Sequence, residues 1–185
     1  VANGHHWAAR IPEYPGHFDG AQIHSHQYRT PFEPVDCIGK RVLVVGMGNS
    51  AMDIASELAQ RPMAEKLFVS TRRGVWIFPK YYRGQKQDKN PAPAWLPKGI
   101  KQWLGARMAK GLVGKMSDYG LPEPEIGPFE SHGTVSGEFL VRAGSGDINM
   151  KPAVERLDGD GVVFTDGSRE KVDVIVWATG IGSPR

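Results

Sequence analysis

The residues from Gly46 to Ala51 have the G-x-G-x-x-A spacing of a phosphate-binding turn. In such a turn the first glycine permits a tight bend, the second lets the backbone approach a pyrophosphate, and the alanine allows close helix–strand packing. The N–H groups that open the following helix then face the phosphates. We therefore expect Gly46, Gly48, Asn49, Ser50 and Ala51 to bind the pyrophosphate of a dinucleotide. The alternative is an ordinary turn between a strand and a helix.

A pair of arginines lies where the adenosine end of that dinucleotide would be held. Arg72 and Arg73 follow Ser70 at the end of a second apolar run. A unit that binds NAD usually places an acidic residue here to hold the ribose 2′-hydroxyl. A guanidinium can instead bind a 2′-phosphate through two hydrogen bonds and stack beside the adenine. Ser70, Arg72 and Arg73 therefore predict NADPH rather than NADH, and the alternative is a solvated basic turn.

Two strands and a helix must hold these residues in place. Val42 to Val45 is a short, β-branched apolar run, typical of a strand buried on both faces, and Lys66 to Thr71 reads as the next strand. Between them a helical repeat places small and apolar residues on one stripe. Its members are Ala51, Ile54, Ala55, Leu58 and Ala59. A strand, a glycine turn, a helix and a strand form the start of a dinucleotide-binding unit.

Composition limits what else the chain can be. Its 185 residues are 40% apolar, enough for one good core, and its net charge of +3 is too small to indicate nucleic-acid binding. A single cysteine, Cys37, excludes an internal disulfide and suits the reducing cytosol, so we expect a cytoplasmic protein. No apolar run approaches 18 residues and no signal-peptide pattern is present, so no membrane-spanning segment is predicted.

A basic, proline-rich excursion interrupts the α/β pattern. Residues 80–97 read as an exposed segment, and residues 98–116 regain a helical repeat with Ile100, Trp103, Leu104, Met108 and Leu112 on one face. The favoured interpretation is a lid helix that packs on a partner domain and keeps its lysines and arginines in water. A weak contact with an anionic membrane surface is the alternative, because the helix combines tryptophan with cations and has no acidic residue.

The flanking regions complete the predicted fold. Residues 1–38 lack sustained periodicity and read as an ordered loop, and a short helix is expected around Ser136 to Arg142. Four short strands should complete the sheet and carry a hairpin on its edge. They are Ile148–Met150, Ala153–Leu157, Val162–Thr165 and Val172–Trp177. The predicted fold is α/β: a Rossmann-like, mostly parallel sheet with an inserted basic helical excursion and a C-terminal β-hairpin.

A second spacing, F-x-G-x-x-x-H-x-x-x-Y, lies just before the first strand and is made by Phe18, Gly20, His24 and Tyr28. By itself it indicates a tight turn with a structural histidine. Together with the following G-x-G-x-S-A turn, it resembles the linker fingerprint of the class B flavin-containing monooxygenases. The resemblance extends to Val1–His6, to Val162–Gly167 and to the A-T-G motif at Ala178–Gly180.

The resemblance implies a domain plan. Residues 1–38 would be the interdomain linker, residues 39–177 the NADPH-binding domain with an insertion at about 78–130, and residues 178–185 the return to an FAD-binding domain. The family's FAD fingerprint, a G-x-G-x-x-G near the N-terminus, has no counterpart in this chain. We therefore expect the chain to be the NADPH-binding part of a longer enzyme, inactive alone, with the FAD-binding domain as its partner and His24 bracing the linker between them.

The resemblance also implies a reaction. NADPH would reduce FAD, the reduced flavin would capture O₂ as a C4a-hydroperoxide, and a nucleophilic nitrogen or sulfur of a small molecule would take one oxygen atom. We assign no catalytic acid or base to this chain, because none of its titratable residues forms a recognisable pair.

Three alternatives to this reaction remain. Baeyer–Villiger relatives normally have Trp where this chain has Tyr28, which favours oxygenation of nitrogen or sulfur over ketones. A pyridine-nucleotide–disulfide reductase relative would need a redox-active cysteine pair, and this chain has only Cys37. The third alternative is a stand-alone NADP-binding module.

Overall fold

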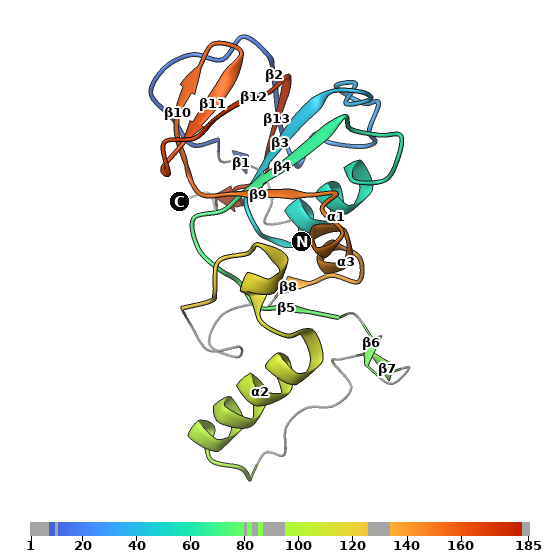
Figure 1. Ribbon diagram of the computed structural model, residues 1–185, viewed down its shortest axis with the longest axis vertical. Helices are drawn as coiled ribbons and strands as arrows, with labels where there is room; N and C mark the ends of the chain where they lie inside the picture. The colour runs from blue at the N-terminus through green and yellow to red at the C-terminus, as the bar shows by residue number, and fades with distance from the viewer. Residues whose placement is uncertain are drawn as a thin grey trace, which may run out of the picture.

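A parallel sheet forms the centre of the protein. The computed structural model describes residues 8–9, 11–79, 81–82, 85–86, 95–125 and 134–182 (Figure 1). Its five-stranded sheet has the order β2-β13-β3-β4-β9, and every neighbouring pair runs parallel. These strands are β2 (Ala21–His24), β13 (Val174–Trp177), β3 (Arg41–Val45), β4 (Lys66–Ser70) and β9 (Asn149–Lys151). The predicted α/β, Rossmann-like sheet is confirmed.

The central strand β3 is buried on both faces, as its apolar run predicts. Val42 and Val44 pack in one apolar cluster with the helix that follows, whereas Leu43 and Val45 pack in a second cluster on the other side of the sheet. Side chains of a strand alternate between the two faces of a sheet. A continuous apolar run therefore supplies both cores at once.

Two helices cover the first face. Helix α1 (Asn49–Leu58) buries the predicted stripe, since Ala51, Ile54, Ala55 and Leu58 are all in the core cluster on that side. Helix α3 (Phe139–Gly144) is the short helix expected around residues 136–142, and it packs beside α1. The small Ala51, fully buried, lets α1 approach the strands closely.

An antiparallel sheet covers the second face. It contains β10 (Val154–Asp158), β11 (Gly161–Phe164) and β12 (Arg169–Lys171) in that order, at the upper left of Figure 1. The predicted C-terminal hairpin is present, but it has a third strand and lies over the face of the main sheet instead of extending its edge. The reason is apolar packing: Val162 and Phe164 share a cluster with the second face of the main sheet.

The expectation that residues 1–38 are loop is wrong at β2. This strand pairs in parallel with β13 and forms one edge of the main sheet. An edge strand has a neighbour on one side only, and of its four residues Ile23 is the buried apolar one. Its polar side chains are satisfied by the neighbouring segment: Gln22 Oε1 accepts a hydrogen bond from Trp177 Nε1 at 3.0 Å. The strand therefore lacks the apolar pattern that would have predicted it.

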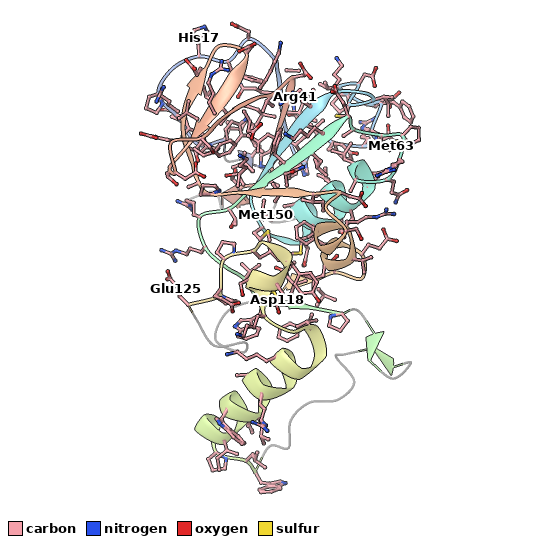
Figure 2. All side chains as sticks on the ribbon, viewed as in Figure 1. His17, Arg41, Met63, Asp118, Glu125 and Met150 are labelled. Carbon is pink, nitrogen blue, oxygen red and sulfur yellow. The ribbon has the colours of Figure 1, made fainter. Side chains whose placement is uncertain are left out.

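The excursion lies at the end of the molecule opposite β10–β12 (Figure 1). Its described elements are β5 (Ile77–Phe78), β6 (Tyr81–Tyr82), β7 (Gln85–Lys86), α2 (Lys98–Val113), the 3₁₀ turn η2 (Met116–Tyr119) and β8 (Thr134–Val135). In Figure 2, Asp118 marks η2, which lies between α2 and the body of the molecule, where Met116 is buried. Much of the predicted exposed segment, 80–97, lies outside the described residues. The pair β1 (Ala8–Ala9) and β14 (Ile181–Gly182) completes the described structure.

Helix α2 confirms the predicted helical repeat but does not bury its predicted apolar face. Ile100 and Trp103 are 49% and 62% exposed, and Arg107 lies over the Trp103 ring at 5.9 Å. The side chains of Met108 and Leu112 lie outside the described residues. No described helix is long and apolar enough to cross a membrane. The lid, the membrane-surface contact and the domain boundaries at 38 and 177 stay predictions.

Candidate functional site

The carboxyl ends of three adjacent strands surround one cleft. Strand β3 leads into Gly46–Gly48, β4 into Thr71–Arg73, and β13 into Ala178–Gly180, and all three segments line a cleft of about 510 Å³. Ligands of open α/β sheets bind outside the carboxyl ends of the strands. The cleft brings together the predicted site residues Gly46, Gly48, Ser70, Arg72 and Arg73.

Gly46 is required by the fold itself. Its φ is +128°, and a Cβ built on it would lie 2.3 Å from the carbonyl oxygen of Ala178. Its N–H donates to the Ser70 carbonyl at 2.9 Å, while the Ala178 N–H donates to the Val45 carbonyl at 2.8 Å. These contacts lock the three loops at the rim of the cleft into one unit, and only glycine fits at their meeting point.

Gly48 is not required by the fold. Its φ of −83° and ψ of 177° suit any residue, and a Cβ built on it would touch no protein atom within 4 Å. It lines the cleft and caps α1, whose first N–H groups have no acceptor within the helix. The backbone here is therefore open to a ligand, which is what the second glycine of a pyrophosphate-binding turn provides. This geometry fits the pyrophosphate of NADPH.

Arg72 and Arg73 supply positive charge at the end of β4. Both side chains are exposed and line the cleft, and neither forms an ion pair with any residue that the structure describes. Thr71 shapes this turn, because its hydroxyl donates to the Arg73 carbonyl at 2.8 Å and accepts from the Arg73 N–H at 3.4 Å. Two guanidinium groups that form no ion pair among the described residues suit an anionic group such as a 2′-phosphate.

Of the remaining predicted site residues, Ser70 and Asn49 have structural partners. Ser70 is buried, and its hydroxyl donates to the Pro152 carbonyl at 2.6 Å, which ties β4 to the segment after β9. Asn49 Oδ1 accepts from the Val135 N–H at 3.2 Å. Ala51 is buried against the sheet, and Ser50 is exposed in the first turn of α1. Asn49, Ser50 and Ala51 do not line the cleft.

His24 lies behind the cleft and not in it. The ring is 1% exposed, and its Nδ1 accepts from the His26 N–H at 3.1 Å. Nε2 lies 3.2 Å from the carbonyl oxygen of Gly180, and it must donate because a carbonyl oxygen only accepts. His24 thus holds the end of the A-T-G loop, which lines the cleft. Its predicted role between two domains stays a prediction.

Sequence reasoning missed several contributors to the cleft, among them Tyr14 and Thr134. Tyr14 lines it and stacks on Trp177 with ring centroids 5.6 Å apart, and Thr134 reaches it from β8. Tyr14 belongs to a stretch without periodicity, and Thr134 returns to the body after the excursion, so neither had a local signal. Trp177 was included only in the strand that precedes the A-T-G motif.

The ionisable side chains that line the cleft are those of Tyr14, Arg72 and Arg73, as far as the structure describes it. The cleft is therefore equipped to bind anions. Groups with perturbed pKa values lie elsewhere: burial, followed by the nearby Asp36, raises the pKa of Cys37 to about 11. Burial and then Glu57, which accepts from the Tyr28 hydroxyl at 3.1 Å, raise the pKa of Tyr28.

Known proteins are similar to this chain in sequence. The family described as Flavin-binding monooxygenase-like matches residues 1–183. Dimethylaniline monooxygenase [N-oxide-forming] 2 of Rattus norvegicus is 36% identical over 97% of this chain and 35% of its own length. Indole-3-pyruvate monooxygenase YUCCA4 of Oryza sativa subsp. japonica is 33% identical over 99% of this chain and 43% of its own length. The chain thus spans well under half the length of either relative.

Solved structures share the fold. Cyclohexanone monooxygenase from Rhodococcus sp. Phi1 bound to NADP⁺ has a TM-score of 0.69 at 17% identity, over 97% of this chain and 45% of that chain. The flavin-containing monooxygenase from Stenotrophomonas maltophilia has a TM-score of 0.53 at 22% identity, over 94% of this chain and 39% of that chain. At these identities the likeness concerns the fold alone. The match over residues 1–183 confirms the predicted resemblance, and the chain belongs to the flavin-binding monooxygenase-like family.

Proposed function

We propose that this chain binds NADPH in the cleft at the carboxyl ends of β3, β4 and β13. In this proposal it is the coenzyme-binding part of an FAD-dependent monooxygenase that oxygenates nucleophilic nitrogen or sulfur. The observation that carries the proposal is made at Gly48. The fold does not need a glycine at this position, and the absence of a side chain leaves the backbone open to a ligand. Membership of the flavin-binding monooxygenase-like family supplies the class of reaction.

The pyrophosphate would lie against Gly48 and the first turn of α1. The N–H groups of Asn49 and Ser50 open this helix, and the helix dipole adds partial positive charge at the same end. Ala51 contributes by packing, since its buried methyl group keeps α1 close to the sheet. Asn49 and Ser50 would therefore bind through their backbone.

Arg72 and Arg73 would hold the 2′-phosphate. Both extend from the strand beside the one that carries the glycine turn, so the pyrophosphate and ribose sites are neighbours along the sheet edge. Because neither arginine has an acidic partner among the described residues, no ion pair must be broken when a phosphate arrives. That arrangement favours NADPH over NADH.

Bound NADPH would supply hydride, and FAD, held mainly by residues outside these 185, would supply the activation of O₂. The tasks of this chain are to bind, to orient and to exclude water. Tyr14, which is stacked on the buried Trp177, contributes a ring to the lining of the cleft, and Gly46 and Ala178 fix the rim on which the nicotinamide half would rest. His24 would hold the A-T-G loop in place beside this rim through its hydrogen bond to the Gly180 carbonyl.

Oxygenation of nitrogen or sulfur is favoured over that of ketones by two features. The relative from Rattus norvegicus is named for N-oxide formation, and Tyr28 occupies the position at which Baeyer–Villiger relatives normally have Trp. Assays of the complete enzyme on a tertiary amine and on a cyclic ketone separate the two reactions. NADPH-dependent turnover of the ketone alone would refute the assignment.

The disulfide-reductase alternative finds no support in Cys37. Its thiol is fully buried, and burial raises its pKa to about 11, so the reactive thiolate is disfavoured.

Stopped-flow reduction of the flavin in the complete FAD-containing enzyme tests the proposal. We expect reduction by NADPH at much lower concentration than by NADH. We also expect the 185 residues alone to show no oxygenase activity, and turnover by this chain alone would refute the placement of FAD outside it.

A further inference from the structure

Strand β8 fastens the end of the excursion to the glycine turn. The Thr134 hydroxyl donates to the carbonyl oxygen of Met47 at 3.3 Å, and the Val135 N–H donates to Asn49 Oδ1 at 3.2 Å. On its other side β8 is held by β5, because the Thr134 N–H donates to the Trp76 carbonyl at 2.9 Å. Thr134 is only 5% exposed and lines the cleft.

The hydrogen bond from Thr134 to the Met47 carbonyl also affects the orientation of Gly48, the next residue of the turn. The peptide between Met47 and Gly48 is planar and trans, so its C=O and N–H groups point in opposite directions. A hydroxyl that holds the Met47 carbonyl on the β8 side therefore fixes the direction of the Gly48 N–H away from β8. Among the described residues this N–H has no acceptor, and Gly48 is exposed and lines the cleft, so a ligand can reach it. The turn thus presents an oriented, unused donor to the cleft.

We propose that Thr134 is a positioning residue of the coenzyme site. Its hydroxyl orients the Met47–Gly48 peptide so that the Gly48 N–H meets a phosphate oxygen of the dinucleotide. Asn49 contributes to the same contact, since its Oδ1 accepts from the Val135 N–H of β8 while its own N–H opens α1. This inference rests on the proposed NADPH-binding function. It links the excursion to the coenzyme site, because β5 and β8 are the first and last described strands of the excursion and β8 contacts the turn.

Three variants of the complete FAD-containing enzyme test the role of Thr134. Thr134→Val keeps the shape of the side chain but removes the hydroxyl, and Thr134→Ser keeps the hydroxyl. Ser136→Ala is the matched control: Ser136 is two residues along, is also buried, and accepts from the Phe139 N–H at 3.1 Å, but does not line the cleft. The readouts are the dissociation constant of NADP⁺ by calorimetry and the melting temperature of each variant.

We expect Thr134→Val to weaken NADP⁺ binding roughly three- to tenfold, the loss that corresponds to one neutral hydrogen bond. Thr134→Ser should bind as the wild type does, and Ser136→Ala should melt earlier yet bind NADP⁺ normally. In kinetics the valine variant should show a raised KM for NADPH with little change in kcat.

The inference is overturned if the wild type binds NADP⁺ and Thr134→Val binds it equally well, and in that case the proposed function stands. It is also overturned if Ser136→Ala weakens binding as much as Thr134→Val, because the effect would then be general loosening of the excursion. A wild type that does not bind NADP⁺ would refute the proposed function together with the inference. If valine disturbs the β5–β8 pair, Thr134→Ala provides the same comparison against Thr134→Ser.

Discussion

Gly46 and Gly48 have opposite structural reasons to be glycine, and substitution should separate them. At Gly48 the backbone conformation is open to any residue, and no protein atom lies within 4 Å of the point that a Cβ would occupy. We therefore expect Gly48→Ala and Gly48→Val to fold normally. The alanine variant should even gain up to about 1 kcal/mol, because the unfolded chain loses conformational freedom.

The same Gly48 variants should lose the coenzyme. A phosphate oxygen must come within about 2.7–3.2 Å of a backbone N–H, and a side chain at Gly48 would project into that space. Loss of one charge-assisted hydrogen bond costs about 1.5–3 kcal/mol, or about one to two decades in affinity. The larger valine should be the more severe of the two.

Gly46→Ala should have the reverse effect on the fold. The positive φ and the carbonyl oxygen of Ala178, 2.3 Å from the new Cβ, force the backbone to shift. Strain of this kind costs about 1–3 kcal/mol, and each kcal/mol lowers the Tm of a domain of this size by about 2–4 °C. Thermal unfolding reports the fold, and NADP⁺ calorimetry on the complete enzyme reports the site. A Gly48→Val enzyme that melts normally and binds NADP⁺ as the wild type does would refute the pyrophosphate assignment.

Further substitutions test the charges and the buried thiol. Replacing Arg72 and Arg73 by Ala should raise the KM for NADPH by about one to two decades and the KM for NADH far less, since only NADPH carries the 2′-phosphate. Equal increases of the two KM values in steady-state assays would contradict this assignment. Burial raises the pKa of Cys37 from 9.0 to about 11, so the fold is favoured by the neutral thiol below pH 9 and loses that contribution as the pH rises through about 11. Between pH 8 and 11 the free energy of unfolding of the wild type, measured in urea, should therefore fall by on the order of 2 kcal/mol more than that of Cys37→Ala. Equal decreases for the two proteins would argue against the shift. Glu170 forms ion pairs with Lys151, Lys66 and Arg41 at 2.7, 3.7 and 3.6 Å. Although burial opposes its ionisation, the hydrogen bond from Lys151 and these cations lower the pKa of Glu170, so Glu170→Gln should destabilise the protein by about 1–2 kcal/mol above pH 4.5 and by progressively less as the pH falls below it. A pH-independent difference in Tm would count against the contribution of these ion pairs.

Local sequence signals predicted the centre of the fold well. The run from Val42 to Val45 is buried on both faces, and the stripe of α1 faces the sheet, because periodicity and burial act over neighbouring residues. Strand β2 escaped prediction because an edge strand with one buried apolar residue, Ile23, needs no apolar run. Pairing with β13, which lies far away along the chain, makes it a strand.

In the candidate site, too, some residues could be placed from local sequence patterns and others could not. The positions of Gly48, Arg72 and Arg73 follow from the lengths of two strands and one turn, so spacing alone placed them at one cleft. The partners of Ser70 and Asn49 are Pro152 and Val135, more than 80 residues away in the chain. No local pattern reveals that those side chains hold neighbouring segments, and for the same reason Thr134 had no signal.

A crystal structure of the complete enzyme with NADP⁺ bound is the most direct test of the proposed coenzyme site. We predict that the pyrophosphate contacts the Gly48 N–H and the first turn of α1, with the 2′-phosphate within hydrogen-bond distance of Arg72 or Arg73. A dinucleotide that lies away from the cleft between β3 and β4, or a 2′-phosphate that contacts neither arginine, would contradict the assignment.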